Sequence, residues 1–203
     1  MHDIVDIFEK EPATEMLAEF KYDGVRCQIH FMPDGKVKIF SRNCEDKTDA
    51  FPDAISAMID AAVAEPERCN AIFDGEIVAI DKESLQIKSF QELSTRARGP
   101  KSENESIQTD VCVMIFDVLA TNQGSLVEQD LKVRREVIHK ILPNMRPGSV
   151  QLAQSTIFKL TTPSRAESET DQIQTLKEEI STYFKLSLDQ FSEGDNHKKS
   201  SKF

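Results

Sequence analysis

From residue 71 to residue 81 the chain reads Ala71-Ile72-Phe73-Asp74-Gly75-Glu76-Ile77-Val78-Ala79-Ile80-Asp81. Side chains of a strand alternate between its two faces, and this stretch is apolar on both faces except at Asp74 and Glu76. We therefore predict a central strand that is covered on both sides. Because burial of an unpaired charge is costly, we expect Glu76 to hydrogen-bond a ligand hydroxyl, coordinate a cation or pair with a basic side chain.

The segments around this strand predict an α+β domain. Apolar or alternating runs favour further strands, at residues 37–46, Val111–Leu119 and Ser149–Phe158. Apolar residues at helical spacing favour helices, at residues 4–17, 51–63 with Pro52 in the first turn, 90–98, 131–142 ended by Pro143, and 173–184. This order favours antiparallel sheets flanked by helices over a regular alternation of parallel strands and helices.

Composition narrows the class of protein. With 203 residues, a net charge of -10 and 39% hydrophobic residues, the chain can bury the core of one globular domain. It contains no apolar run of the ~18 residues that a membrane span needs and no cleavable signal pattern, so we expect a soluble, intracellular protein. The four cysteines form no Cys-x-x-Cys pair, and the chain has no Walker-type phosphate loop. Zinc sites, disulfide scaffolds and P-loop chemistry are therefore not indicated.

A charged cluster precedes the first of these strands. Residues 19–26 read Glu19-Phe20-Lys21-Tyr22-Asp23-Gly24-Val25-Arg26, and Pro33-Asp34-Gly35 marks a second turn. Asp-Gly is a strong hairpin signal, so we predict a hairpin over residues 20–31 that places Lys21 opposite Arg26, with Glu19 on the same side. A lysine with its ordinary pKa of about 10.4 is protonated at neutral pH, whereas a neighbouring cation favours the neutral amine. We interpret Lys21 as a nucleophile; solvated charges on a surface hairpin are the alternative.

The order Lys-x-Asp-Gly-x-Arg, here Lys21, Asp23, Gly24 and Arg26, resembles a nucleotidyl-transfer motif. That motif belongs to the superfamily of ATP-dependent DNA ligases, RNA ligases and mRNA-capping guanylyltransferases. Residues 20–30 and 37–46 are similar to ATP-dependent DNA ligases of the eukaryotic replicative type, and the resemblance extends from about residue 19 to about residue 160. It implies an ATP-grasp-like nucleotidyltransferase, or adenylation, domain.

The resemblance also implies a role for each candidate residue. Lys21 would attack ATP and carry AMP as a phosphoramidate, Glu19 would recognise the adenine amine, and Phe116 would stack on the purine. Arg26 would hold the ribose or a phosphate. The implied nucleotide site further includes Tyr22, Arg42 and Glu76, the implied Mg²⁺ ligands are Glu76 and Glu193, and the implied DNA contacts are Arg42, Arg96 and Arg98.

Plainer readings remain open for several of these residues. Without the resemblance, Phe116 in an apolar strand would be interpreted as a core side chain. Glu76 would be interpreted as one partner of a structural ion pair. Arg42 is otherwise a solvated loop residue. Arg96 and Arg98 are otherwise solvated cations near the negative end of a helix dipole.

The C-terminal end departs from the resemblance. Glu193-Gly194 is followed by Asp195-Asn196-His197-Lys198, where such ligases have an apolar strand and then a Lys-x-Lys motif. We therefore interpret residues 1–192 as a partial adenylation domain, incomplete at its C-terminus, and residues 193–203 as a divergent, disordered basic tail. On this interpretation we expect self-adenylation by the chain to be slow or absent.

The predicted function is that of a catalytic-domain fragment of an ATP-dependent DNA ligase. A complete enzyme would seal nicks in duplex DNA during replication, repair and recombination, with DNA-binding and oligonucleotide-binding domains that this acidic chain lacks. We expect a monomer in the nucleus. Two alternatives stay open: a guanylyltransferase or RNA ligase of the same superfamily, and a catalytically inactive binding fragment or incomplete gene model.

Overall fold

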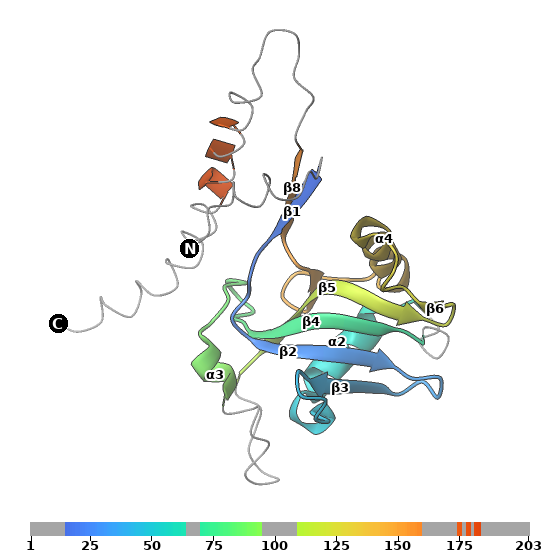
Figure 1. Cartoon of the computed structure of the whole chain (residues 1–203). Helices are drawn as coiled ribbons and strands as arrows, with labels where there is room; N and C mark the ends of the chain where they lie inside the picture. The colour runs from blue at the N-terminus through green and yellow to red at the C-terminus, as the bar shows by residue number, and fades with distance from the viewer. Residues whose placement is uncertain are drawn as a thin grey trace, which may run out of the picture. The chain divides into compact units, whose positions relative to one another are not determined.

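A computed structural model describes residues 15–63, 70–94 and 109–159, together with residues 174–175, 178–179 and 181–183. The chain divides into two compact units, one of residues 22–153 and the other of residues 1–21 with 154–203. Each unit is described by itself (Figure 1). The predicted domain boundary after residue 192 and the candidates Arg96, Arg98 and Glu193 lie outside the described residues.

A six-stranded sheet forms the centre of the larger unit. The strand order is β3 (Val37–Ser41), β2 (Val25–Phe31), β4 (Ile72–Ala79), β5 (Val111–Thr121) and β6 (Gly124–Ser125), and these neighbours are all antiparallel. A short strand, β7 (Val150–Leu152), pairs with β5 in parallel. The prediction of β4 as a central strand and of β5 as a second buried strand is confirmed, because β4 lies between β2 and β5 and both strands are largely buried.

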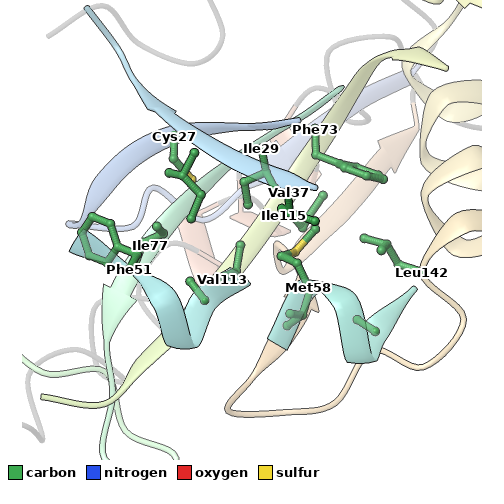
Figure 2. Close-up of a cluster of buried hydrophobic side chains, with 14 of the residues drawn as sticks. Cys27, Ile29, Val37, Phe51, Met58, Phe73, Ile77, Val113, Ile115 and Leu142 are labelled. Carbon is green, nitrogen blue, oxygen red and sulfur yellow. The ribbon is translucent and has the colours of Figure 1, made fainter. Parts of the chain in front are cut away.

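Helices cover the apolar face of this sheet. α2 (Pro52–Ala61) begins with its proline in the first turn, where the missing N–H costs nothing, and packs on β5, as does α4 (Leu131–Ile141). The core combines alternate residues of the strands with the inner faces of these helices (Figure 2), including Cys27, Ile29, Phe51, Met58, Phe73, Ile77, Val113, Ile115 and Leu142. Both helices were predicted from spacing. The remaining elements are η1 (Thr48–Ala50) and α3 (Phe90–Ser94).

The smaller unit contains a two-stranded antiparallel sheet. β1 (Glu15–Glu19) pairs with β8 (Ser155–Lys159) from Glu15 opposite Lys159 to Glu19 opposite Ser155. The predicted helix over residues 4–17 is therefore wrong for residues 15–17, which are extended. The predicted strand over residues 149–158 is two strands, β7 and β8, which belong to different sheets.

The predicted hairpin over residues 20–31 is also wrong. β2 pairs with β3 and β4, and the hairpin is β2–β3, which turns at Gly35 with a φ of 79°. Gly24 has no positive φ and is required for a different reason: a Cβ there would lie 2.3 Å from the carbonyl oxygen of Ile77 on β4. The Asp-Gly pair thus marks a close approach of backbones instead of a primed turn.

Lys21 consequently does not face Arg26 across a strand pair. The Cα partner of Arg26 on β4 is Glu76. Within the part of the chain that the structure describes, no helix is both long enough and apolar enough to span a membrane.

Candidate functional site

Arg26 and Asp74 form the ion pair around which the candidate site is built. They project from β2 and β4 on the face opposite the buried Cys27 and Phe73, since side chains alternate along a strand. Arg26 donates from Nε to Asp74 Oδ1 at 3.2 Å and from Nη2 to Oδ2 at 2.7 Å. The Arg26 side chain is 53% exposed and that of Asp74 only 8%. The two-pronged contact therefore fixes a cation that remains accessible from outside.

The same contact stabilises the charged form of Arg26. Its hydrogen bonds and attraction to Asp74 raise the pKa of the guanidinium further above its ordinary value. The sequence already signalled a need for a partner, because Asp74 interrupts an apolar strand, but it did not indicate that the partner would be Arg26. A fixed guanidinium at this position suits a phosphate or a hydroxyl-rich ligand.

Phe116 lies beside this cation. The Cζ atom of Arg26 is 5.7 Å from the centre of the Phe116 ring, within cation–π range. Phe116 is half-buried, whereas its neighbour Ile115 is fully buried in the core. The β4–β5 register passes from Gly75 opposite Ile115 to Asp74 opposite Asp117, so Phe116 is the extra residue of a β-bulge. A bulge re-aims a side chain, and here it brings an aromatic ring next to the exposed guanidinium.

Glu76 anchors the segment that leads into β2. Its Oε1 accepts a hydrogen bond from the backbone N–H of Gly24 at 3.2 Å. The absent side chain of Gly24 permits this approach, because a Cβ would meet both the Ile77 carbonyl oxygen at 2.3 Å and Glu76 Cγ at 2.9 Å. Glu76 therefore couples the Lys-x-Asp-Gly-x-Arg segment to the central strand.

The structure brings some candidates together and leaves others apart. Arg26, Glu76 and Phe116 converge on one face of the sheet, and Tyr22 in the same unit is buried. Lys21 is exposed and Glu19 ends β1, and both belong to the smaller unit. The roles of Lys21 and Glu19 thus stay predictions, whereas the positions of Arg26, Glu76 and Phe116 on one face of the sheet are observed.

Arg42 is exposed in the turn that follows β3. Asp46 organises this turn by accepting hydrogen bonds from the Thr48 backbone N–H at 3.0 Å and from Lys38 Nζ at 3.1 Å. The turn is therefore held by local hydrogen bonds that leave the Arg42 side chain at the surface.

We expect the Asp46 carboxyl to titrate with a pKa of about 2, since hydrogen bonds from Thr48 and then Lys38 favour its ionised form. A folded pKa below the ordinary 3.8 means that this stabilisation is present above about pH 4 and is lost as the pH falls through about 2. NMR of the side-chain carboxyl carbon measures it. Thr48→Val should raise the pKa and Thr48→Ser should not; a midpoint near 3.8 in the unaltered protein would contradict the geometry.

The described residues include no group of three or more His, Cys, Asp or Glu side chains that could hold a metal ion. Mg²⁺ is usually bound through one or two carboxylates together with substrate phosphates, so a protein-only cluster is not what such a site requires. Glu76 is the candidate ligand in the described part of the chain, and its carboxylate lies on the same face as Arg26. It can supply one oxygen ligand to a metal–phosphate complex.

Comparison with known proteins identifies the family. Residues 1–194 match the family model described as ATP dependent DNA ligase domain. DNA ligase 1 of Arabidopsis thaliana is 39% identical over 150 residues, which are 74% of this chain and 18% of that protein. DNA ligase 1 of Dictyostelium discoideum is 43% identical over 133 residues, 66% of this chain and 11% of that protein. The chain thus spans less than a fifth of the length of these relatives.

Two solved structures have a similar fold. The ligase domain from M. tuberculosis LigD has a TM-score of 0.51 at 18% identity, covering 81% of this chain and 44% of that one. A mycobacterial DNA ligase D complexed with ATP and MES has a TM-score of 0.52 at 18% identity, with the same coverage. The predicted fold class, α+β with antiparallel sheets and helices, is confirmed.

Proposed function

Because the chain belongs to the family of ATP-dependent DNA ligase domains, we propose that it binds ATP and accepts AMP on Lys21, the first step of DNA ligation. The observation that carries this proposal is the face of the sheet on which Phe116 and Glu76 converge with Arg26, the last residue of the Lys-x-Asp-Gly-x-Arg segment. A stacking ring, a fixed cation and a carboxylate are the three kinds of group that a nucleotide needs.

In the proposed reaction the neutral ε-amine of Lys21 attacks the α-phosphorus of ATP. A P–N bond forms, the bond from the α-phosphorus to the bridging oxygen breaks, pyrophosphate leaves, and the amine loses a proton. Phe116 stacks on the adenine, Arg26 binds the ribose or a phosphate, and Glu19 accepts a hydrogen bond from the adenine amine. Tyr22 packs beside the nucleotide and Glu76 meets the ribose.

When bound, Mg²⁺ would supply neutralisation of the negative charge that develops on the leaving pyrophosphate. We assign Glu76 as a ligand of this ion, and Glu193 as a second ligand. Arg26 acts by its position, since Asp74 already fixes its guanidinium before any ligand arrives.

For a complete ligase we propose that AMP passes from Lys21 to the 5′-phosphate of a nick and is displaced by the 3′-hydroxyl. The substrate is nicked duplex DNA, with Arg42, Arg96 and Arg98 as phosphate contacts in a nuclear, monomeric enzyme that serves replication, repair and recombination. This chain carries a net charge of -10, so in a complete ligase the affinity for DNA must come mainly from basic surfaces outside this chain.

ATP and GTP distinguish this proposal from a capping-type guanylyltransferase. When the chain is incubated separately with each nucleotide labelled in the α-phosphate, together with Mg²⁺, we expect slow, acid-labile labelling from ATP. Labelling from GTP should be at least about tenfold weaker, since a base of the wrong hydrogen-bonding pattern leaves polar groups unpaired. Equal or stronger labelling from GTP, or an acid-stable label, contradicts the proposal.

A further inference from the structure

Two aspartates lie directly opposite each other at the bulge. Asp74 on β4 and Asp117 on β5 are Cα partners, an arrangement that is destabilising when both side chains are charged and unpaired. Each one has its own arginine: Arg26 from β2 binds Asp74, and Arg134 from the first turn of α4 binds Asp117. The bulge is therefore held between two arginine–aspartate pairs, only one of which touches the proposed nucleotide site.

The Arg134–Asp117 pair is more fully shielded from solvent than the Arg26–Asp74 pair. Arg134 donates from Nε to Asp117 Oδ1 at 2.7 Å and from Nη2 to Oδ2 at 2.9 Å, and its Nη1 donates to the carbonyl of Gln129. The side chains of Arg134 and Asp117 are only 16% and 17% exposed. Hydrogen bonds to Asp117 raise the pKa of Arg134 above its ordinary value. All three guanidinium nitrogens are thus committed to fixed partners.

Asp117, held by Arg134, also binds the backbone of its own strand. Its Oδ1 also accepts the backbone N–H of Val118 at 2.8 Å. Phe116, immediately before Asp117, is the residue that the strand register skips, so its direction depends on the local backbone of the bulge. Arg134 fixes Asp117, and Asp117 fixes the backbone that aims the Phe116 ring.

We propose that Arg134 is a positioning residue for the nucleotide site, which acts through Asp117 to hold the ring of Phe116 beside Arg26 where the purine stacks. This inference rests on the proposed function for the identity of the ligand, but the positioning itself is a property of the protein without ligand. A purely structural salt bridge between α4 and β5 would affect stability and leave the direction of Phe116 unchanged.

A single tryptophan separates these two roles. The chain has no tryptophan, so Phe116→Trp places the only one in the bulge. In that background, Arg134→Gln should shift the emission to longer wavelength, lower the anisotropy and increase quenching by acrylamide, while circular dichroism shows an intact fold. Lys132→Gln removes the same charge from an exposed position of α4 and should change none of these signals. An unchanged tryptophan in folded Arg134→Gln overturns the proposal.

Two further variants keep the test decisive if Arg134→Gln fails to fold. Asp117→Asn keeps the shape of the side chain and weakens the hold of Arg134, so we expect the same spectral change. Arg134→Lys keeps the charge, but one ammonium cannot span both carboxylate oxygens and the Gln129 carbonyl, so a partial change is expected. Spectra of Asp117→Asn that match the Phe116→Trp parent contradict the positioning role.

Nucleotide binding supplies the second readout. In the chain with Phe116 retained, Arg134→Gln should weaken ATP binding about 5- to 30-fold, the lower part of the contribution of base–aromatic stacking. Binding of inorganic tripolyphosphate, which has no base, should not change. Equal weakening for both probes contradicts the proposal. A wild-type chain that binds no ATP refutes the proposed function, whereas the tryptophan spectra, recorded without nucleotide, still decide whether Arg134 positions residue 116.

Discussion

Replacing Lys21 with alanine should abolish protein-bound AMP completely. The proposed intermediate contains a P–N bond, and alanine offers no nitrogen to form it. Wild-type protein, incubated with ATP and Mg²⁺ for long enough to accumulate slow label, should carry the adduct on the peptide that contains Lys21 when it is mapped by mass spectrometry. Binding of unreacted ATP should fall only a few-fold, because stacking and the phosphate contacts remain in place.

Lys21→Arg is the matched control for charge. Arginine keeps a cation at this position, but its guanidinium stays protonated and cannot act as a nucleophile. We therefore expect neither Lys21→Ala nor Lys21→Arg to become labelled with AMP. If position 21 contributed only a positive charge, Lys21→Arg would still be labelled. Lys36→Ala removes an exposed lysine that pairs with Asp34 and should leave labelling unchanged. An AMP adduct in Lys21→Ala, or one mapped elsewhere in the wild type, would refute the assignment.

Periodicity predicted the elements that carry the core. The apolar stretches that became β4 and β5, and the helical spacing that became α2 and α4, each encode burial within a single segment. Such information is local, so it can be read without knowledge of partners. The resemblance to DNA ligases rested on other segments, the Lys-x-Asp-Gly-x-Arg motif and residues 20–30 and 37–46, and it is confirmed by the family match.

Pairing partners were not predictable in the same way. β1 pairs with β8 (Ser155–Lys159), which is distant from it in the sequence, and nothing local in Glu15–Glu19 specifies that partner. The Asp23-Gly24 signal was misread because glycine serves two purposes, positive φ and close approach, which have the same sequence signature. Only the position of Ile77 reveals that close approach is the reason here.

In the candidate site, too, some residues could be predicted from the sequence and others could not. Phe116 and Glu76 were identified through the resemblance, and the structure places both beside Arg26 or its segment. Asp117 and Arg134 were missed, since neither a single aspartate within a strand nor an arginine on an amphipathic helix indicates its partner in the sequence. Their significance depends on a register shift that places Phe116 in a bulge, and a register shift has no sequence signal of its own.

Gly24→Ala should nearly eliminate AMP transfer while leaving the protein folded. The new methyl would lie 2.3 Å from the Ile77 carbonyl oxygen and 2.9 Å from Glu76 Cγ, so the segment must move away from β4. That movement lengthens or breaks the 3.2 Å hydrogen bond from the Gly24 N–H to Glu76. Overpacking costs about 1–3 kcal/mol and a hydrogen bond to a charged group contributes about 1.5–3 kcal/mol.

The loss of stability and the loss of alignment are detected by different measurements. Thermal unfolding should show a lower melting temperature, by about 2–4 °C for each kcal/mol in a protein of this size. Labelling by ATP should fall about 100-fold, because displacement of the motif by a fraction of an ångström costs about 3 kcal/mol of transition-state stabilisation. Measuring both on one preparation separates loss of alignment from loss of fold.

Gly124→Ala is the control that isolates the close approach. Gly124 has a φ of 116° and nothing within 4 Å of a Cβ, so alanine there is strained by backbone conformation alone. It should lower stability by about 1 kcal/mol and leave labelling unchanged. If Gly24→Ala matched the wild type in both stability and labelling, the segment would have room to spare, and its tight contact with β4 could not be what aligns the motif. If it matched Gly124→Ala, the loss would be one of stability only, and Glu76 would have no part in holding the reactive segment in place.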